Sequence, residues 1–397
     1  MKNEKVMTLR FDQHNFSHLF ERFLFNRGKV NEDISSVVQK ILSEIRIKGD
    51  TSLISMIKKF DKLSIKNLDE IKIKSQDLKK AFLKLPNSQK VALKFAFNRI
   101  KFFHEKQIPT PFNFKDSYGV QLGVKFEPIN SVGFYIPGGK AIYPSTVLMN
   151  AIPALVAGVK KRIMISPISL AQPPQILLAA AYLSKITEFY AMGGAHSIAA
   201  LAYGTKTIKK VDKICGPGNI YVSEAKRQVF GEVGIDSIAG PSEILVVSDN
   251  KNDPNWIAFD LLSQSEHDEQ ARAILITDDD VFASKVENCI KNVLEKLPRK
   301  KIAYKSWISN GCIIVLKNLK DSVKLINNIA PEHLQLSLDK PYDYFRKITN
   351  AGSIFIGRYT PEAIGDYVAG PNHILPTGGI IVVVSFHSIE DKIVKNF

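Results

Sequence analysis

The spacing of apolar residues separates a helical first part of the chain from a longer part in which strands and helices alternate. Apolar positions recur at helical spacing over Asn31–Lys59 and again over Leu78–His104, and Pro109 and Pro111 end the second stretch. Residues 1–127 are therefore expected to be mainly helical.

From Ser131 onward, short β-branched runs are separated from helical patterns by Gly and Pro. The expected strands are SVGFYI, RIMISP, ITEFYAM and VDKIC, followed by a second series, EILVVSD, AILITDD, CIIVL and GSIFIG. The helical patterns between them include STVLMNAIPALVAG, QILLAAAYLS and HSIAALAYG in the first series, and NWIAFDLLSQSEH and VFASKVENCIKNVLEKL in the second. Alternation of this kind predicts βαβ units and parallel sheets, and two series in succession predict two doubly wound α/β domains.

Three glycine-rich turns each follow an expected strand and precede an expected helix. They are IPGGKAIYPS (136–145), MGGAHS (192–197) and CGPGNIYVSEAKRQV (215–229). Glycine lets the backbone approach a ligand, and a helix N-terminus favours anions, so these turns suit a phosphorylated cofactor. Each turn alone is more typical of a chain that merely reverses direction, and none is a dinucleotide fingerprint or a P-loop. Their shared position at neighbouring strand ends favours a ligand crevice.

Candidate metal ligands and proton acceptors lie in the second series. Gln264 and His267 are three residues apart in an expected helix, which places an amide oxygen and an imidazole on one face, although two ligands do not make a zinc site. Glu332 and His333 are adjacent before an alternating strand, where they suit two separate proton acceptors. Asp366 is a candidate third metal ligand. The alternatives for these residues are a solvated helix face and a helix-terminal histidine.

Three further residues carry weaker signals. His373 shares a Gly- and Pro-rich stretch with Asp366, and Ser242 occupies a tight turn before a strand, where a serine often only caps a turn. Cys215 precedes the third glycine-rich turn, but no base is adjacent in sequence to activate its thiol.

Charge raises the question of a nucleic-acid partner, since Lys+Arg 54 against Asp+Glu 39 gives a net charge of +15. Lysine supplies 43 of these cations and arginine 11, and the lysines are scattered among Ile and Asn. Arginine is the better reader of phosphates and bases. A solvated lysine-rich surface is therefore the expectation, with no nucleic-acid partner.

Cysteine content and hydropathy point to the cytoplasm. The 3 cysteines are widely spaced without a C-x-x-C pair, which is typical of reduced thiols. No apolar run is long enough for a membrane span, and the N-terminus lacks the apolar centre of a signal peptide. The expectation is a cytoplasmic protein without a membrane partner.

The ordered set of motifs resembles the histidinol dehydrogenase family from about residue 31 to residue 379. The segments that carry the resemblance are GFYIPGGKAIYPSTVLMNAIPA, VDKICGPGNIYVSEAKRQV, AGPSEILV, DLLSQSEHD, PEHL and GDYVAGPNHILPT. The resemblance implies two related, incomplete Rossmann-like domains, working as a homodimer. It implies an N-terminal arm (1–27), a first α/β domain (28–127 plus 243–376), a second, NAD-binding α/β domain (128–242) and an atypical C-terminal tail (377–397).

The resemblance also implies an activity, namely the oxidation of L-histidinol to L-histidine with two NAD used in sequence. It assigns NAD contacts to Tyr135, Asn219 and His196, and the catalytic bases are Glu332 and His333. One zinc per subunit would be bound by Gln264, His267 and Asp366. The residues implied to contact substrate are Ser242, Gln264, His267, His333, Asp366 and His373.

Two departures from the family pattern stand out. His196 occupies a position where the family usually has Gln, which places cofactor affinity in question. After Gly379 the chain reads IIVVVSFHSIEDKIVKNF, which is similar to a segment of the bacterial ribosomal-RNA cytosine N4-methyltransferases. The family's usual tail, with a further substrate-binding Glu and zinc-ligand His, is expected to be missing, and His387 and Glu390 are not expected to replace them. The alternative to an active enzyme is therefore an inactive family member that still dimerises or binds nucleotide.

Overall fold

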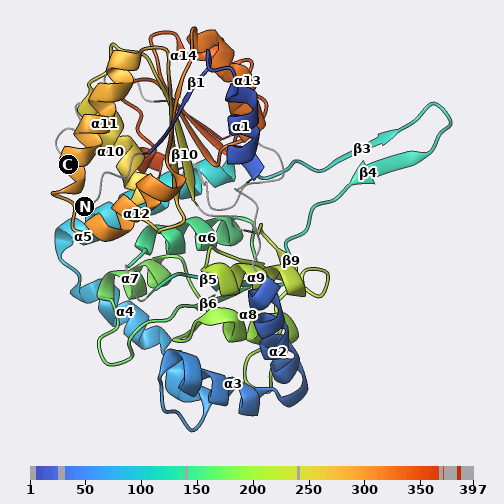
Figure 1. The fold of residues 1–397 in the computed structure, drawn as a ribbon. Coiled ribbons are helices and arrows are strands. Elements are labelled where there is room, and N and C mark those ends of the chain that lie inside the picture. The colour runs from blue at the N-terminus through green and yellow to red at the C-terminus, as the bar shows by residue number, and fades with distance from the viewer. Residues whose placement is uncertain are drawn as a thin grey trace. The chain divides into compact units, whose positions relative to one another are not determined.

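The computed structural model describes residues 6–25, 32–138, 142–238, 242–365 and 370, and the backbone of 382–385. The chain forms two compact units, each with its own mainly parallel sheet (Figure 1). Unit 1 comprises residues 1–30, 240–369 and 376–397, and unit 2 comprises residues 31–239 and 370–375. None of the described helices is long and apolar enough to cross a membrane.

Unit 2 is built on a sheet whose strand order is β2-β7-β6-β5-β8-β9. The strands are β2 (Lys72–Ile73), β5 (Ser131–Tyr135), β6 (Lys161–Ile165), β7 (Glu188–Tyr190), β8 (Lys213–Cys215) and β9 (Gly234–Ile235). All pairings are parallel except that of β2 with β7. Every residue of β5 is buried, as expected of a central parallel strand covered on both faces.

The helices of unit 2 cover this sheet with one apolar core. They are α2 (Glu32–Lys48), α3 (Asp50–Met56), the π-helical turn η2 (Ile57–Asp61), the 3-10 turn η3 (Leu68–Ile71), α4 (Ser75–Lys84), α5 (Asn87–Glu105), α6 (Pro144–Val156), α7 (Gln175–Leu183), α8 (Gly194–Tyr203) and α9 (Ile220–Val229). Helix α2 packs on α8 and α9, α4 on α7, and α5 on α6. The helical segment 31–127 therefore groups with residues 128–239, whereas the sequence placed it with 243–376.

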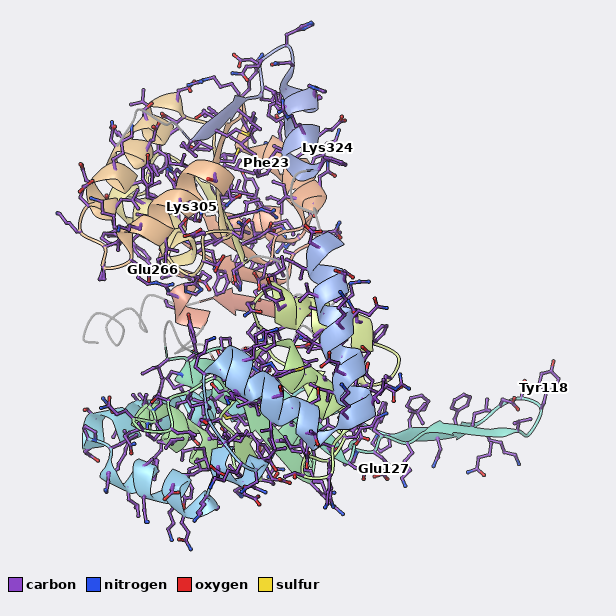
Figure 2. All side chains as sticks on the ribbon, turned by 60° about the horizontal axis from the view of Figure 1, so that its bottom comes forward. Phe23, Tyr118, Glu127, Glu266, Lys305 and Lys324 are labelled. Carbon is purple, nitrogen blue, oxygen red and sulfur yellow. The ribbon has the colours of Figure 1, made fainter. Side chains whose placement is uncertain are left out.

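A hairpin interrupts the helical first part of the chain, where no strand was expected. Strands β3 (Phe112–Lys115) and β4 (Gln121–Val124) form a separate antiparallel ribbon that extends away from the rest of unit 2 (Figure 1; Figure 2).

Unit 1 is built on a parallel sheet with the strand order β1-β12-β11-β10-β13-β14-β15. The strands are β1 (Met7–Arg10), β10 (Glu243–Ser248), β11 (Arg272–Thr277), β12 (Cys312–Val315), β13 (His333–Ser337), β14 (Ser353–Ile356) and β15 (Val382–Ser385). The helical elements are α1 (Phe16–Phe25), α10 (Pro254–Ser265), α11 (Asp280–Leu294), α12 (Lys300–Asn310), the 3-10 turn η4 (Leu319–Asp321), α13 (Ser322–Ile329) and α14 (Pro341–Phe345).

Side chains of the unit 1 strands alternate between two apolar cores. Along β10, Leu245 and Val247 pack with α1 and α13, while Ile244 and Val246 pack with α10, α11 and α12. Two covered faces explain why these strands read as continuous apolar runs.

The expected α/β fold class with parallel sheets is confirmed. The N-terminal segment differs from the expected arm, because β1 pairs in parallel with β12 and Phe16 and Phe20 of α1 pack into the unit 1 core. Residues 6–25 are thus an edge of the unit 1 sheet.

Candidate active site

The glycine-rich turns of unit 2 meet where its strand order reverses. Strand β5 lies between β6 and β8, so the turns that leave β5 and β8 run side by side at the carboxyl ends of the strands. An ideal Cβ at Gly216, whose φ is +111°, would lie 2.1 Å from the carbonyl oxygen of Tyr135. A Cβ at Gly138 would lie 2.8 Å from the carbonyl oxygen of Pro167. These two glycines are required for close backbone approach, which is also what a bound pyrophosphate needs.

A buried ion pair holds the turn after β8. Lys226 of α9 donates from Nζ to the carbonyl oxygen of Gly216 at 2.9 Å, and the N–H of Gly216 donates to Asp236 Oδ2 at 2.7 Å. Lys226 and Asp236 also contact each other, with side chains only 2% and 4% exposed. Both backbone groups of Gly216 are therefore fixed by charged side chains that the sequence analysis did not single out.

Asn219 begins α9 as its N-cap. Its Oδ1 accepts from the N–H groups of Tyr221 at 3.1 Å and Val222 at 3.2 Å. This side chain therefore caps the N-terminus of α9, and the cofactor contact expected of it stays a prediction.

Tyr135 and His196 meet at a second cluster of unit 2, around the turn after β7. The N–H of Gly194 donates to Tyr135 Oη at 3.3 Å. His196 is 1% exposed, and its Nε2 lies 2.8 Å from Asp61 Oδ2. Burial is the main reason that the pKa of Tyr135 is raised, so the phenol stays neutral and keeps its proton.

Asp61 links this cluster to the helical first part of the chain. Its Oδ1 accepts from the N–H of Gly193 at 3.1 Å, and the ring of the preceding residue, Phe60, stacks on His196 with centroids 5.6 Å apart. The sequence offered no signal for Asp61, because it ends a π-helical turn within an ordinary amphipathic stretch.

Cys215 lacks the surroundings that activate a thiol. Its side chain is buried, and burial raises the pKa of the thiol to about 12. A thiol that stays protonated at neutral pH is unreactive.

In unit 1 the candidate proton acceptors lie at the amino ends of the strands. Strands β10 and β13 are neighbours, with Ile244 opposite His333. Glu332 Oε2 accepts from the N–H of Glu243 at 3.0 Å, and the carboxylate of Glu243 is held by Arg272 at 2.9 Å. Ser242 precedes β10 at the same edge, so the structure brings Ser242, Glu332 and His333 to one end of the sheet.

His333 is buried between α10 and the segment after β14. Its Nδ1 lies 3.2 Å from Gln264 Oε1 and 3.9 Å from Glu362 Oε1. When Nδ1 donates its hydrogen to Gln264, the basic lone pair of the ring is on Nε2. The carboxylate of Glu362, which the sequence analysis missed, is buried beside the ring.

The helix that carries Gln264 is shorter than expected. Helix α10 ends at Ser265, and His267 lies in the turn that follows, with its side chain exposed. Asp268 accepts from the N–H of Gln270 at 3.0 Å, a local side-chain bond that competes with helix continuation. The N–H of His267 donates to the carbonyl oxygen of Gln264 at 3.2 Å, so the two residues stay neighbours through a turn.

A second polar pair lies deeper on the same helix and strand. Gln335 Nε2 donates to Asp260 Oδ2 at 2.6 Å and to Ser337 Oγ at 3.0 Å. Burial raises the pKa of Asp260 to about 7, against the lowering effect of the Gln335 bond. Asp260 lies one helical turn before Gln264, and Gln335 lies two residues after His333 on β13. The Asp260–Gln335 contact therefore repeats the Gln264–His333 contact further along the same helix and strand.

Cofactor fit differs between the two units. The crowded glycines and the capped helix of unit 2 form a cradle that suits a dinucleotide. In unit 1, Gln264 and His267 supply an amide oxygen and an imidazole, both acceptable to zinc. Within the described ranges no group of three His, Cys, Asp or Glu residues forms a metal cluster. Asp366 and His373 lie outside the described residues, as do His387 and Glu390.

The fold and its two clusters define a Rossmann-like α/β protein with glycine-rich strand-to-helix turns in one unit and an adjacent Glu–His pair in the other. The family model described as histidinol dehydrogenase matches residues 25–394. A histidinol dehydrogenase from Gluconobacter oxydans is 47% identical over 378 residues, which is 95% of this chain and 88% of that protein. Histidinol dehydrogenase 1 from a Nostoc species is 46% identical over 97% of this chain and 89% of its own length.

A solved structure agrees with these sequence comparisons. The crystal structure of histidinol dehydrogenase from Elizabethkingia anophelis superposes with a TM-score of 0.86 at 35% identity, covering 94% of this chain and 85% of that one. This chain belongs to the histidinol dehydrogenase family, whose members are NAD-dependent oxidoreductases. The family match extends to residue 394, and nothing supports the expected methyltransferase-like segment at 380–397.

Proposed function

We propose that this protein oxidises L-histidinol to L-histidine in two successive hydride transfers to NAD, as a cytoplasmic homodimer with one zinc per subunit. The observation that carries the proposal is the adjacent pair Glu332–His333, held at the amino end of β13 by contacts from β10 and α10. The alternative of an inactive nucleotide-binding relative has no observation in its favour.

In the first oxidation, His333 accepts the proton of the substrate hydroxyl while a hydride leaves the carbinol carbon for NAD. Gln264 orients the ring through Nδ1, and Glu362 stabilises the positive charge that the ring acquires. The product of this step is the aldehyde, L-histidinal, and the electron pair of the broken C–H bond resides in NADH.

In the second oxidation, Glu332 removes a proton from a water molecule that adds to the aldehyde carbon. After His333 has released the proton of the first step to solvent, the hydrate anion loses a hydride to a second NAD, and the carboxylate forms as His333 takes up the remaining hydroxyl proton. The N–H of Glu243 fixes the Glu332 carboxylate in the orientation that this role needs.

Zinc would be held by Gln264, His267 and Asp366, where it supplies a positive centre that binds the imidazole and amino groups of the substrate. Ser242 and His373 are the further proposed substrate contacts. For NAD the proposed contacts are Tyr135, His196 and Asn219. The close packing at Gly216 and Gly138 supports this assignment, because both turns follow strands at the reversal point of the sheet.

The experiment is an end-point assay of NADH absorbance with limiting L-histidinol and saturating NAD and zinc. Two NADH per histidinol are expected, with L-histidine as the product identified by mass spectrometry. One NADH per histidinol would refute the aldehyde step, and no NADH at any zinc concentration would refute the proposed function.

A further inference from the structure

Asp61 joins the helical first part of unit 2 to the glycine turn between β7 and α8. Its Oδ1 accepts from the N–H of Gly193 at 3.1 Å, and its Oδ2 lies 2.8 Å from Nε2 of His196. Helix α3, which leads into the π-helical turn that ends at Asp61, packs on α8 (Figure 1). Such π-helical turns are rare, and they are often found at functional sites. One carboxylate therefore holds both the backbone of the glycine turn and the imidazole beside it.

The imidazole of His196 has contacts on its face as well as at its edge. The ring of Phe60 stacks on it with centroids 5.6 Å apart. An ideal Cβ on Gly194 would lie 3.2 Å from both Nδ1 and Cε1, so glycine at this position leaves space beside Nδ1. The side chain of His196 is only 2% exposed, and a close-packed interior does not let such a ring turn over without displacing its neighbours.

The carboxylate of Asp61 decides which ring nitrogen carries the hydrogen. A carboxylate only accepts hydrogen bonds, so Nε2 is the donor of this contact. In a neutral ring the other nitrogen, Nδ1, then has the lone pair. His196 lies in the first turn of α8, where the positive end of the helix dipole disfavours a positively charged ring. The geometry therefore makes Nδ1 a hydrogen-bond acceptor.

We infer that Asp61 is a positioning residue for NAD, which holds His196 in the tautomer whose Nδ1 accepts a hydrogen bond from the cofactor. The groups of a dinucleotide that donate such a bond are its ribose hydroxyls and its amino groups. The inference rests on the NAD contact proposed above for His196, and it adds the direction of that hydrogen bond and the residue that sets it.

Tyr135, a second proposed NAD contact, is affected by the same carboxylate. Its Oη accepts from the N–H of Gly194, which follows the N–H that donates to Asp61. Burial raises the pKa of Tyr135, the Gly194 bond lowers it, and the negative charge of Asp61 adds to the rise. The phenol therefore keeps its proton. Together the two side chains offer a dinucleotide one acceptor, Nδ1, and one donor, Oη.

An imidazole makes this arrangement depend on residue 61 in a way that an amide would not. The amide of glutamine, which the family usually has at position 196, carries a donor and an acceptor and presents either one by rotating. A neutral imidazole exchanges the roles of its two nitrogens only when its hydrogen moves. The identity of residue 61 therefore matters most when residue 196 is histidine.

The test exchanges one oxygen of Asp61 for an amide nitrogen. In Asp61→Asn, Oδ1 still accepts from Gly193, so the new NH₂ group faces Nε2 and the ring hydrogen moves to Nδ1. Nδ1 then meets the donor group of the cofactor as a second donor. Titration calorimetry should show NAD binding about 10–100-fold weaker, the cost of unpaired buried donors. The kcat at saturating NAD should change by less than about 3-fold, because the contact is the same in the ground state and the transition state.

Two comparisons separate this role from a general loss of structure. Asp50→Asn is the matched control, because Asp50 also accepts from a turn of unit 2 with both oxygens, at 3.4 Å from the N–H and 2.7 Å from Oγ1 of Thr207. A hydroxyl both donates and accepts, so NAD affinity should stay within about 2-fold of wild type. In a His196→Gln background, Asp61→Asn should weaken NAD binding by less than about 3-fold, since the amide rotates to compensate.

Nitrogen-15 NMR of protein labelled at histidine reports the tautomer directly. The signals that disappear in His196→Gln should show a neutral ring with its hydrogen on Nε2 in wild type and on Nδ1 in Asp61→Asn. A doubly protonated ring or an Nδ1–H tautomer in wild type, unchanged NAD affinity in Asp61→Asn, or an equal loss in the His196→Gln background would overturn the inference. A series that follows these expectations in a protein that forms no NADH from histidinol would leave the inference standing and refute the proposed function.

Discussion

The sheets of the two units have the same strand order, yet their candidate functional residues lie at opposite ends of the strands. In unit 2 the order β7-β6-β5-β8-β9 places Gly216 and Asn219 after the carboxyl end of β8. In unit 1 the equivalent order β12-β11-β10-β13-β14 places Glu332 and His333 at the amino end of β13. The same sheet topology therefore carries candidate residues of different chemistry at the two ends of its strands.

This chemical difference arises because helix N-termini lie at the carboxyl ends of the strands and helix C-termini lie at the amino ends. At a carboxyl edge strands lead into helix N-termini, whose N–H groups favour anions such as a pyrophosphate. At an amino edge helix C-termini lead into strands, and their carbonyl groups favour cations. Helix α13 ends at Ile329 shortly before Glu332, and α10 ends at Ser265 beside His267. Such an edge suits a protonated imidazole, a metal ion and the cationic amine of the proposed substrate.

The largest effect is expected from the proton acceptors of unit 1. His333→Asn should lower kcat for both oxidations by about 10²–10⁴-fold, and Glu332→Gln should lower histidinal oxidation by a similar factor while sparing histidinol oxidation. Rapid-quench measurements starting from each substrate separate the two steps. Calorimetric NAD affinity should be unchanged in both variants. A loss of NAD binding in these variants would contradict the assignment of proton transfer to unit 1 and NAD binding to unit 2.

The buried ion pair of unit 2 should show a large and non-additive effect on stability. Lys226→Met or Asp236→Asn alone leaves a charge unpaired in the interior and should lower the free energy of unfolding by about 3–5 kcal/mol. The double variant should recover most of that stability yet bind NAD about 10-fold more weakly, because Gly216 has lost its anchoring charge. Urea unfolding and NAD titration of all four proteins complete the cycle. Alanine at Lys210, whose bond to Glu232 is at the surface, is the matched control and should cost about 0–1 kcal/mol.

Gly216→Ala should weaken cofactor binding by about 10–100-fold, since its Cβ would meet the Tyr135 carbonyl oxygen at 2.1 Å and displace the turn. Gly231→Ala is the control, because Gly231 also has a positive φ, +98°, but an ideal Cβ there would meet no atom of the described residues within 4 Å. That variant should lose about 1–2 kcal/mol of stability from backbone strain and keep its NAD affinity. Equal NAD affinities in the two variants would contradict a ligand-holding role for the turn at Gly216.

Asp260 should give unit 1 a pH-dependent stability around neutral pH. Its pKa is raised to about 7 in the folded protein from an ordinary value of 3.8, so the folded state holds a proton that the unfolded state releases. The stabilisation is full below pH 3.8 and is lost as pH rises through 7. Asp260→Asn, which resembles the protonated acid, should therefore gain stability relative to wild type as pH rises from about 4 to about 8, by on the order of 4 kcal/mol at the upper end. Urea unfolding across that range should give diverging curves, and parallel curves would show that Asp260 is not buried as a neutral acid.

Much of the fold was accessible from the sequence because the signals are local. Buried parallel strands are short β-branched runs, and EILVVSD and AILITDD became β10 and β11 with almost the expected bounds. The adjacency of Glu332 and His333 before an alternating run correctly placed both at a strand entrance. The glycine-rich turns were expected to approach a ligand, whereas the structure shows Gly216 and Gly138 packed against the backbone of Tyr135 and Pro167.

The partners of the candidate residues were not accessible, because they come from distant parts of the chain. Glu332 is oriented by the backbone of Glu243, and His196 by Asp61, which belongs to the helical first part. Glu362 and Asp260 are carboxylates without a motif, and only burial beside His333 and Gln335 gives them a chemical role.

The N-terminal strand and the hairpin show the physical reason for this limit. A helix closes its hydrogen bonds four residues away, so the period of α2 or α4 is readable in a short window. A strand closes its hydrogen bonds on another segment, and Met7–Arg10 becomes a strand only because Cys312–Val315 lies beside it. Local sequence therefore determined the helices, the buried strands and the glycine turns. Tertiary structure decided which short extended segments pair and which edge of each sheet carries the chemistry, since both depend on neighbours that are distant along the chain.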